Sequence, residues 1–130
     1  MNWQNTALGL AGAIGAGTAV VHGILTQRLM VRPIEALFES DGRTSATIRR
    51  VVPLALHFST VVWFLGGLAL IAAALWFEPD ARRATGLLVG GTFLLGALGN
   101  LWATRGHHPG WMLMLAAVIL IAVALGRSAG

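Results

Sequence analysis

Four apolar stretches, separated by short polar connections, constrain this chain more than any other feature of its sequence. They run roughly over residues 7–29, 51–76, 84–103 and 111–126. A helix that crosses the hydrocarbon core of a bilayer needs about 20 mostly apolar residues. The last stretch is shorter than that and would have to use its flanking residues or thin the bilayer. The stretches are continuous, whereas membrane-spanning strands alternate between apolar and polar residues, so we expect helices.

The composition favours membrane insertion and excludes several other classes of protein. Hydrophobic residues make up 56% of the chain and charged residues only 11%, whereas a soluble domain carries about 25% charged residues. The chain contains no cysteine, which excludes a disulfide framework, a thiolate metal site and a cysteine nucleophile. The net charge of +4 arises because nine arginines outnumber five acidic residues. Most of the arginines lie in the connections, where they set membrane topology, so we expect no nucleic-acid partner.

Short connections force consecutive helices to pack antiparallel. We therefore expect an all-α, up-down-up-down four-helix bundle that forms one transmembrane domain over residues 1–130. A signal peptide is the alternative for the first stretch, but residues 1–6 carry no positive side chain. The first and third connections and their edges hold six arginines, and the opposite side holds three. Because cytoplasmic connections carry the excess of positive charge, both termini are expected outside.

The first connection is the only long one. Residues 33–40 have the pattern of a short amphipathic helix, which we expect to lie in the plane of the membrane interface. The residue before a proline favours an extended conformation, so a break is expected at Arg32, before Pro33. Thr44 or Ser45 is expected to cap the helix of the second span.

Small residues recur at helical spacing in the first span, where Gly12 and Ala16 form a ridge next to Gly15, Ala19 and Gly23. The third span adds Gly86, Gly90, Gly96 and Gly99. Helices in lipid associate through close backbone packing at such residues, so we expect packing within the chain, with self-association as the alternative.

Tryptophans mark the ends of the spans. Trp3, Trp76, Trp102 and Trp111 lie close to span ends, as expected of the aromatic belts at the two interfaces. Trp63 lies in the middle of the second span and should face the bundle or a ligand, because a buried indole needs a partner for its N–H.

Polar residues inside the spans are costly in lipid and are therefore candidates for function. At about 1.5 Å per residue, His22, His57 and Asn100 lie at a similar depth, roughly 8–10 Å inside the cytoplasmic edge. Thr18 and Thr26 flank His22 on the same helix face. Together with Ser59 and Trp63, these residues predict a polar layer in the cytoplasmic half of the bundle.

Four interpretations of this layer stay open. The side chains can hydrogen-bond across helices and stabilise the bundle. Alternatively, His22 and His57 could be axial ligands of a haem iron or of the magnesium in a chlorin pigment, with small residues nearby leaving room for the flat macrocycle. A quinone or proton site is the third interpretation. The fourth is a path for a small solute or a metal ion.

No catalytic arrangement is expected, and all five acidic residues lie in connections. Ser59 lies two residues from His57, so on a helix the two side chains point apart and cannot form a nucleophile pair. His107 and His108 are expected to be solvated turn residues, with His108 as a possible cap for the fourth helix. They make a poor metal site because no carboxylate or thiol accompanies them.

Four motifs carry a resemblance: VHG at 21–23, RPIEAL at 32–37, LHFSTVVW at 56–63 and TRGHHPGW at 104–111. The chain resembles a family of small, uncharacterised bacterial inner-membrane proteins with four spans. That family has a histidine and then an arginine-proline step after its first span, a histidine opening the second span, and an arginine-glycine-x-histidine turn before a tryptophan. The resemblance covers most of the chain and implies the fold and the bacterial inner membrane, but no activity.

A second resemblance covers one span only. Leu56 and His57, followed by Trp63 and the glycines at 66–67, are similar to one helix of CopD-type copper-resistance membrane proteins. The rest of that family's pattern is not seen.

We therefore expect a small non-enzymatic membrane protein that acts as a structural or accessory subunit, surrounded by lipid and associated with itself or with a larger membrane complex. The first alternative is a haem- or pigment-binding redox subunit that uses His22 and His57. The second is a small homo-oligomeric transporter or channel.

Overall fold

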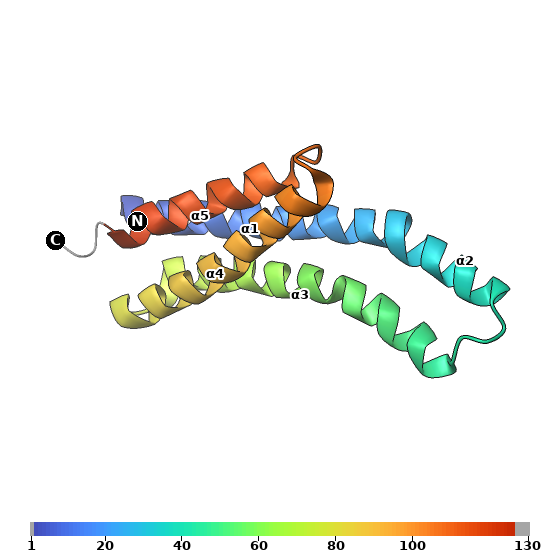
Figure 1. The fold of residues 1–130 in the computed structure, drawn as a ribbon. Helices are drawn as coiled ribbons and strands as arrows, with labels where there is room; N and C mark the ends of the chain where they lie inside the picture. Colours follow the sequence, from blue (N-terminus) through green and yellow to red (C-terminus); the bar gives the residue numbers. More distant parts are fainter. Residues whose placement is uncertain (1, 127–130) are drawn as a thin grey trace.

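The computed structural model describes residues 2–126, which form helices joined by short turns (Figure 1). In chain order these are α1 (Trp3–Thr26), a π-helical turn η1 (Gln27–Val31), α2 (Arg32–Ser40), α3 (Ala46–Trp76), α4 (Pro79–Thr104) and α5 (Gly110–Gly126). The all-α class is confirmed. Three helices are long and apolar enough to cross a membrane: the 38-residue rod Trp3–Ser40, α3 and α4. The apolar helix α5 is shorter.

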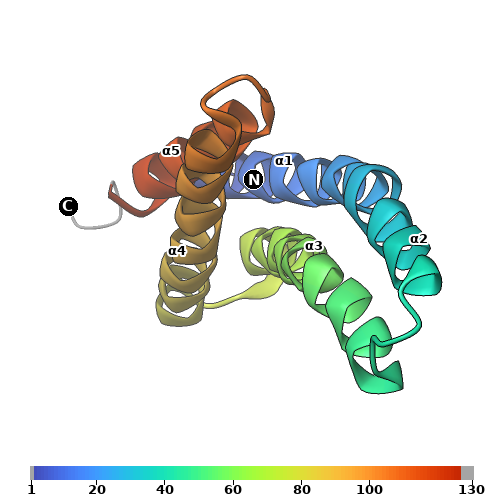
Figure 2. The ribbon, with the colours of Figure 1, turned by 45° about the vertical axis from the view of Figure 1, so that its right-hand side comes forward.

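The helices pack around a common core. α3 packs on α1, α4 packs on α3, and α5 lies against both α4 and α1. Figures 1 and 2 show consecutive helices running back and forth, with α4 crossing the others obliquely. One part projects from this core: η1, α2 and the first turns of α3 extend past α4 and α5 as a helical hairpin (Figure 1). We call this segment, residues 27–55, the arm.

The expected break before Pro33 is wrong. Arg32 is helical, with φ −57° and ψ −47°, and α1 continues through η1 into α2. A proline inside an α-helix lacks an N–H, and its ring collides with the carbonyl four residues earlier. The π-helical turn directly before Pro33 widens the backbone there and accommodates the ring. Residues 33–40 are helical as predicted, but as the continuation of α1 and not as a separate helix.

Local caps fix where the helices begin and end. The Ser45 hydroxyl accepts from the Ile48 N–H at 3.3 Å, which confirms Ser45 as the cap of α3. At the other end of α3, Arg82 donates from Nε to the Ala73 carbonyl at 3.2 Å and from Nη2 to the Phe77 carbonyl at 2.7 Å. A cation at a helix C-terminus is favourable because it satisfies carbonyls that lack helical partners.

The glycine-rich faces are the seams between helices. A Cβ added to Gly12 would lie 2.5 Å from the Gly67 carbonyl oxygen, and one added to Gly67 would lie 2.6 Å from the Ala16 backbone nitrogen. The backbones of α1 and α3 therefore touch at this crossing. Gly15 packs against the buried ring of Phe93 in α4. The prediction that these small residues pack within the chain is confirmed at these positions.

α4 uses its glycines in two different ways. Gly86 and Gly90 pack against Leu125 and Ile121 of α5, and Gly96 packs against Trp63 of α3. Gly91 and Gly99, in contrast, have nothing within 4 Å of an added Cβ.

Candidate functional site

Two side-chain pairs link α1 and η1 to α3 within the predicted polar layer. His22 Nε2 lies 3.3 Å from Ser59 Oγ, and His57 Nε2 lies 2.8 Å from Gln27 Oε1. Polar residues of neighbouring helices are therefore hydrogen-bond partners of each other in these two pairs. Gln27 was not predicted as part of the layer, although a glutamine at the end of an apolar run, about one turn beyond His22, could have suggested it.

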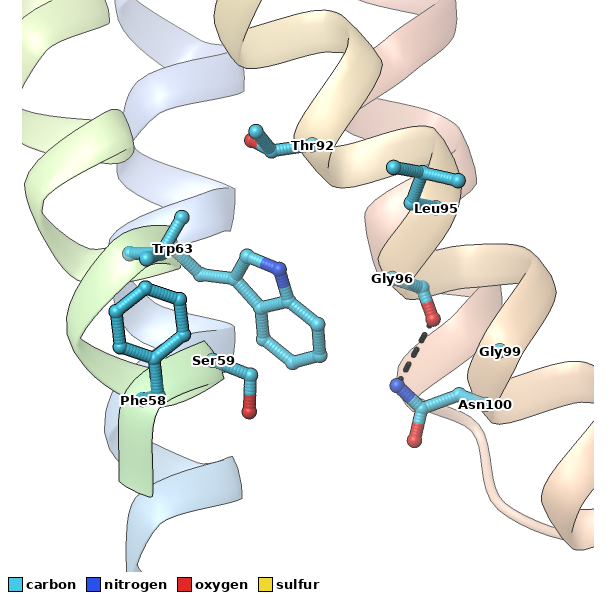
Figure 3. Close-up of a pocket in the computed structure, with 9 residues that line it drawn as sticks. Phe58, Ser59, Trp63, Thr92, Leu95, Gly96, Gly99 and Asn100 are labelled. Atoms are coloured by element: carbon cyan, nitrogen blue, oxygen red, sulfur yellow. Dashed lines mark hydrogen bonds between the residues drawn. The ribbon is translucent and has the colours of Figure 1, made fainter. Parts of the chain in front are cut away.

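Trp63 faces the bundle, which was one of the two expectations for it. Its side chain is 7% exposed, and its ring centroid lies 4.7 Å from that of His22 with the two planes tilted by 52°. The indole reaches across to α4, where the missing side chain of Gly96 makes room for it (Figure 3). The indole N–H has no hydrogen-bond partner among residues 2–126.

The remaining members of the layer divide into bonded and unbonded groups. Asn100 donates from Nδ2 to the Gly96 carbonyl of its own helix at 3.0 Å (Figure 3). Thr18 and Thr26 are both buried on the α1 face that carries His22. The hydroxyl of Thr18 is enclosed and has no partner within the described part of the chain.

An inner cavity of about 170 Å³ lies beside these groups. Its polar lining comes from Thr18, His22, Trp63, Asn100 and His108. His108 was expected to be a solvated turn residue that might cap the last helix. It does cap it, since its Nδ1 accepts from the Gly110 N–H at 3.1 Å, but its half-buried ring also lines the cavity. Only the fold brings this turn next to α1.

A second hollow, which we call the cleft, opens between α3 and α4 and has a volume of about 430 Å³ (Figure 3). Apolar side chains, including Phe58 and Leu95, line much of it. Its polar groups are Ser59, Thr92, Asn100 and the indole of Trp63. Trp63 and Asn100 line both the cleft and the inner cavity, so they form the partition between the two.

These contacts bear on the haem hypothesis. The small residues expected to leave room for a macrocycle serve close packing: a Cβ on Gly23 would lie 2.8 Å from Thr60 Cγ2. Nε2 of His22 and of His57 each already faces a side-chain oxygen. The geometry therefore favours hydrogen bonding between the helices, and haem ligation stays a prediction.

The site as a whole has a few polar groups in a mostly apolar lining and is almost free of charge. Among residues 2–126, no ionisable side chain lines the cleft, and His22 and His108 are the only ones that line the inner cavity. Within residues 2–126 no three histidine or acidic side chains gather in a way that could hold a metal ion. Such a site can bind neutral groups through hydrogen bonds and stacking.

The chain matches no protein-family model, no curated protein and no solved structure.

Proposed function

We propose that this chain is a non-enzymatic integral protein of a bacterial inner membrane, and that it serves as a structural or accessory subunit of a larger membrane assembly. In this proposal α1, α3, α4 and α5 cross the bilayer up and down, with both termini outside and the arm in the cytoplasm. Large apolar side chains cover the outward faces of all four helices, which supports contact with lipid.

The tryptophans support a position for the bilayer. Trp3 begins α1 and Trp76 ends α3, whereas Trp102 and Trp111 lie at the opposite end of the bundle. A hydrocarbon core of about 30 Å corresponds to about 20 helical residues. About 20 residues counted forward from Trp3 end near Gly23, and about 20 counted backward from Trp76 end near Leu56. The polar layer then lies just inside the cytoplasmic interface, and the arm lies beyond it.

The observation that carries the accessory role is the apolar surface of the arm. Leu37 is 65% exposed and Ile48 is 48% exposed, and both lie in the connection between the first two predicted spans. Lipid does not cover a segment beyond the bilayer, and an uncovered apolar patch outside lipid marks a surface for a protein partner. We therefore assign the arm as the attachment point to the rest of the assembly.

The test is native electrophoresis of the tagged protein, expressed at its natural level in its own host and solubilised in a mild detergent. We expect it to resist extraction from membranes by alkaline carbonate and to migrate within a complex larger than its own oligomers. Leu37→Glu should release it from that complex. Ser40→Glu is the matched control, because it adds the same charge to the arm without removing an apolar contact. A wild-type protein that migrates alone would contradict the proposal.

A further inference from the structure

We propose that the cleft between α3 and α4 binds a neutral, lipid-soluble ring compound that carries carbonyl oxygens, of the quinone class, and that the ligand enters sideways from the membrane. This inference does not depend on the accessory role of the arm. It rests on the shape of the cleft, on the unused hydrogen-bonding groups in its wall and on the residues at its mouth.

The size and position of the cleft suit such a ligand. Its volume of about 430 Å³ falls within the range of small-molecule sites, about 300–1,000 Å³. On the α4 side, Gly99 leaves the backbone bare, because an added Cβ there would meet nothing within 4 Å, whereas Gly96 is covered by the indole of Trp63. A flat ring can therefore lie against α4 beside the indole of Trp63 (Figure 3).

The wall of the cleft offers hydrogen-bond donors without acceptors. The Trp63 side chain is 7% exposed, and its N–H, which is not fully enclosed, bonds to no residue between 2 and 126. Asn100 uses one N–H for the Gly96 carbonyl, which leaves the second N–H and Oδ1 unbonded to the described residues. The Ser59 hydroxyl also lines the cleft but already contacts His22 Nε2, so the unused donors are those of Trp63 and Asn100. Polar groups left unpaired in an apolar surrounding are costly, and ring carbonyls would accept from these donors.

The mouth of the cleft selects against charged ligands. Phe58 is 69% exposed and Leu95 is 73% exposed, so the opening faces lipid with apolar side chains. Within the described part of the chain no arginine or acidic residue lines the cleft, so no described side chain there would pair with the charges of a phospholipid headgroup. A ligand with a neutral head and an apolar tail fits the polar wall and the apolar mouth of the cleft. Its head would contact Trp63 and Asn100, and its tail would lie beside Phe58 and Leu95.

The experiment uses decylubiquinone as the probe and the fluorescence of Trp63 as the readout. The other four tryptophans, Trp3, Trp76, Trp102 and Trp111, are replaced by phenylalanine, and the full chain is studied in detergent. We expect quenching that saturates at one quinone per chain. Quenching that rises linearly with quinone, as for an indole dissolved in the same micelles, would overturn the proposal.

Two glycine variants of α4 separate binding in the cleft from binding elsewhere. Gly99→Leu fills the cleft, whereas Gly91→Leu adds the same side chain at an equally open position that does not line it. We expect Gly99→Leu to raise the apparent Kd by at least about tenfold and Gly91→Leu to leave it unchanged. Equal affinities for the two variants would overturn the proposal.

Two further measurements keep the test decisive if Gly99→Leu fails to fold. Asn100→Leu removes the amide but keeps the approximate side-chain volume, and should weaken binding up to about tenfold through the lost hydrogen bonds. Decylbenzene has the ring and the tail without the carbonyls, and should not displace the quinone. Full affinity in Asn100→Leu, or displacement by decylbenzene, would show that the carbonyls are not recognised.

Discussion

At the scale of single residues, two pairs of polar side chains link α3 to α1 and η1. His22 contacts Ser59, and His57 contacts Gln27. Residue spacing predicted that histidines and hydroxyl groups of different helices would lie at one level. It did not predict which groups would pair, because pairing depends on the rotation of each helix about its own axis. Residue spacing therefore did not predict that Gln27 and His108 belong to the site.

A double-mutant cycle tests the pair formed by His57 and Gln27. We expect His57→Phe and Gln27→Leu to be non-additive, with a coupling of about 0.6–1.7 kcal/mol in the free energy of unfolding in detergent. The reference cycle joins Gln27→Leu to His107→Ala, because His107 is an exposed turn residue. That cycle should be additive within about 0.5 kcal/mol. If the first cycle is additive as well, the hydrogen bond between His57 and Gln27 does not stabilise the protein.

Visible absorption tests ligation by His22 and His57. We expect purified protein supplied with haem to show only the spectrum of haem in detergent. The reason is that each Nε2 already faces an oxygen and that α1 and α3 touch at Gly23 and Thr60. A low-spin haem spectrum that disappears in both His22→Ala and His57→Ala would establish the redox alternative instead.

At the scale of helices, small residues decide how closely the elements approach. The spacing of glycine and alanine in α1 predicted a packing face, and the structure places α3 against that face at Gly12 and Ala16. The sequence did not distinguish open glycines from packed ones. Gly67 and Gly91 both lie in apolar helices, yet an added Cβ would meet the α1 backbone at Gly67 and no described residue within 4 Å at Gly91.

This difference gives a stability prediction. Gly67→Ala should lower the free energy of unfolding by about 1–3 kcal/mol, because its Cβ would lie 2.6 Å from backbone atoms of α1, which cannot rotate away. Gly91→Ala is the control. It should be neutral or stabilise by up to about 1 kcal/mol through better helix propensity. Denaturant titration in detergent measures both, and equal stabilities would contradict the close approach at Gly67.

At the scale of the whole molecule, the rod Trp3–Ser40 is longer than a bilayer is thick. Its 38 residues span about 57 Å at 1.5 Å per residue, against about 30 Å of hydrocarbon. Most of the charged residues of the chain lie in the arm, including Arg28, Glu35 and Arg49. When the apolar part of the rod crosses the membrane, the arm therefore lies in water.

Cysteine labelling tests this position, and the absence of native cysteine makes any introduced one unique. We expect a membrane-impermeant maleimide to label Glu39→Cys in inside-out vesicles only and Asp80→Cys in right-side-out vesicles only, because the two lie at opposite ends of the bundle. Leu65→Cys, on the exposed middle of α3, should react in neither. The opposite pattern for the first two would reverse the orientation.

The sequence by itself determined the helical class, the apolar stretches and the candidate polar residues, because hydropathy and residue spacing act locally along the chain. Only the tertiary structure decided that α1 continues past Pro33, since a π-helical turn overcomes the local preference for a break. It also decided that Trp63 and Asn100 separate a cleft from an inner cavity, and that His108 reaches the polar layer. These features depend on how the helices rotate and cross, which follows from contacts between residues far apart in the sequence.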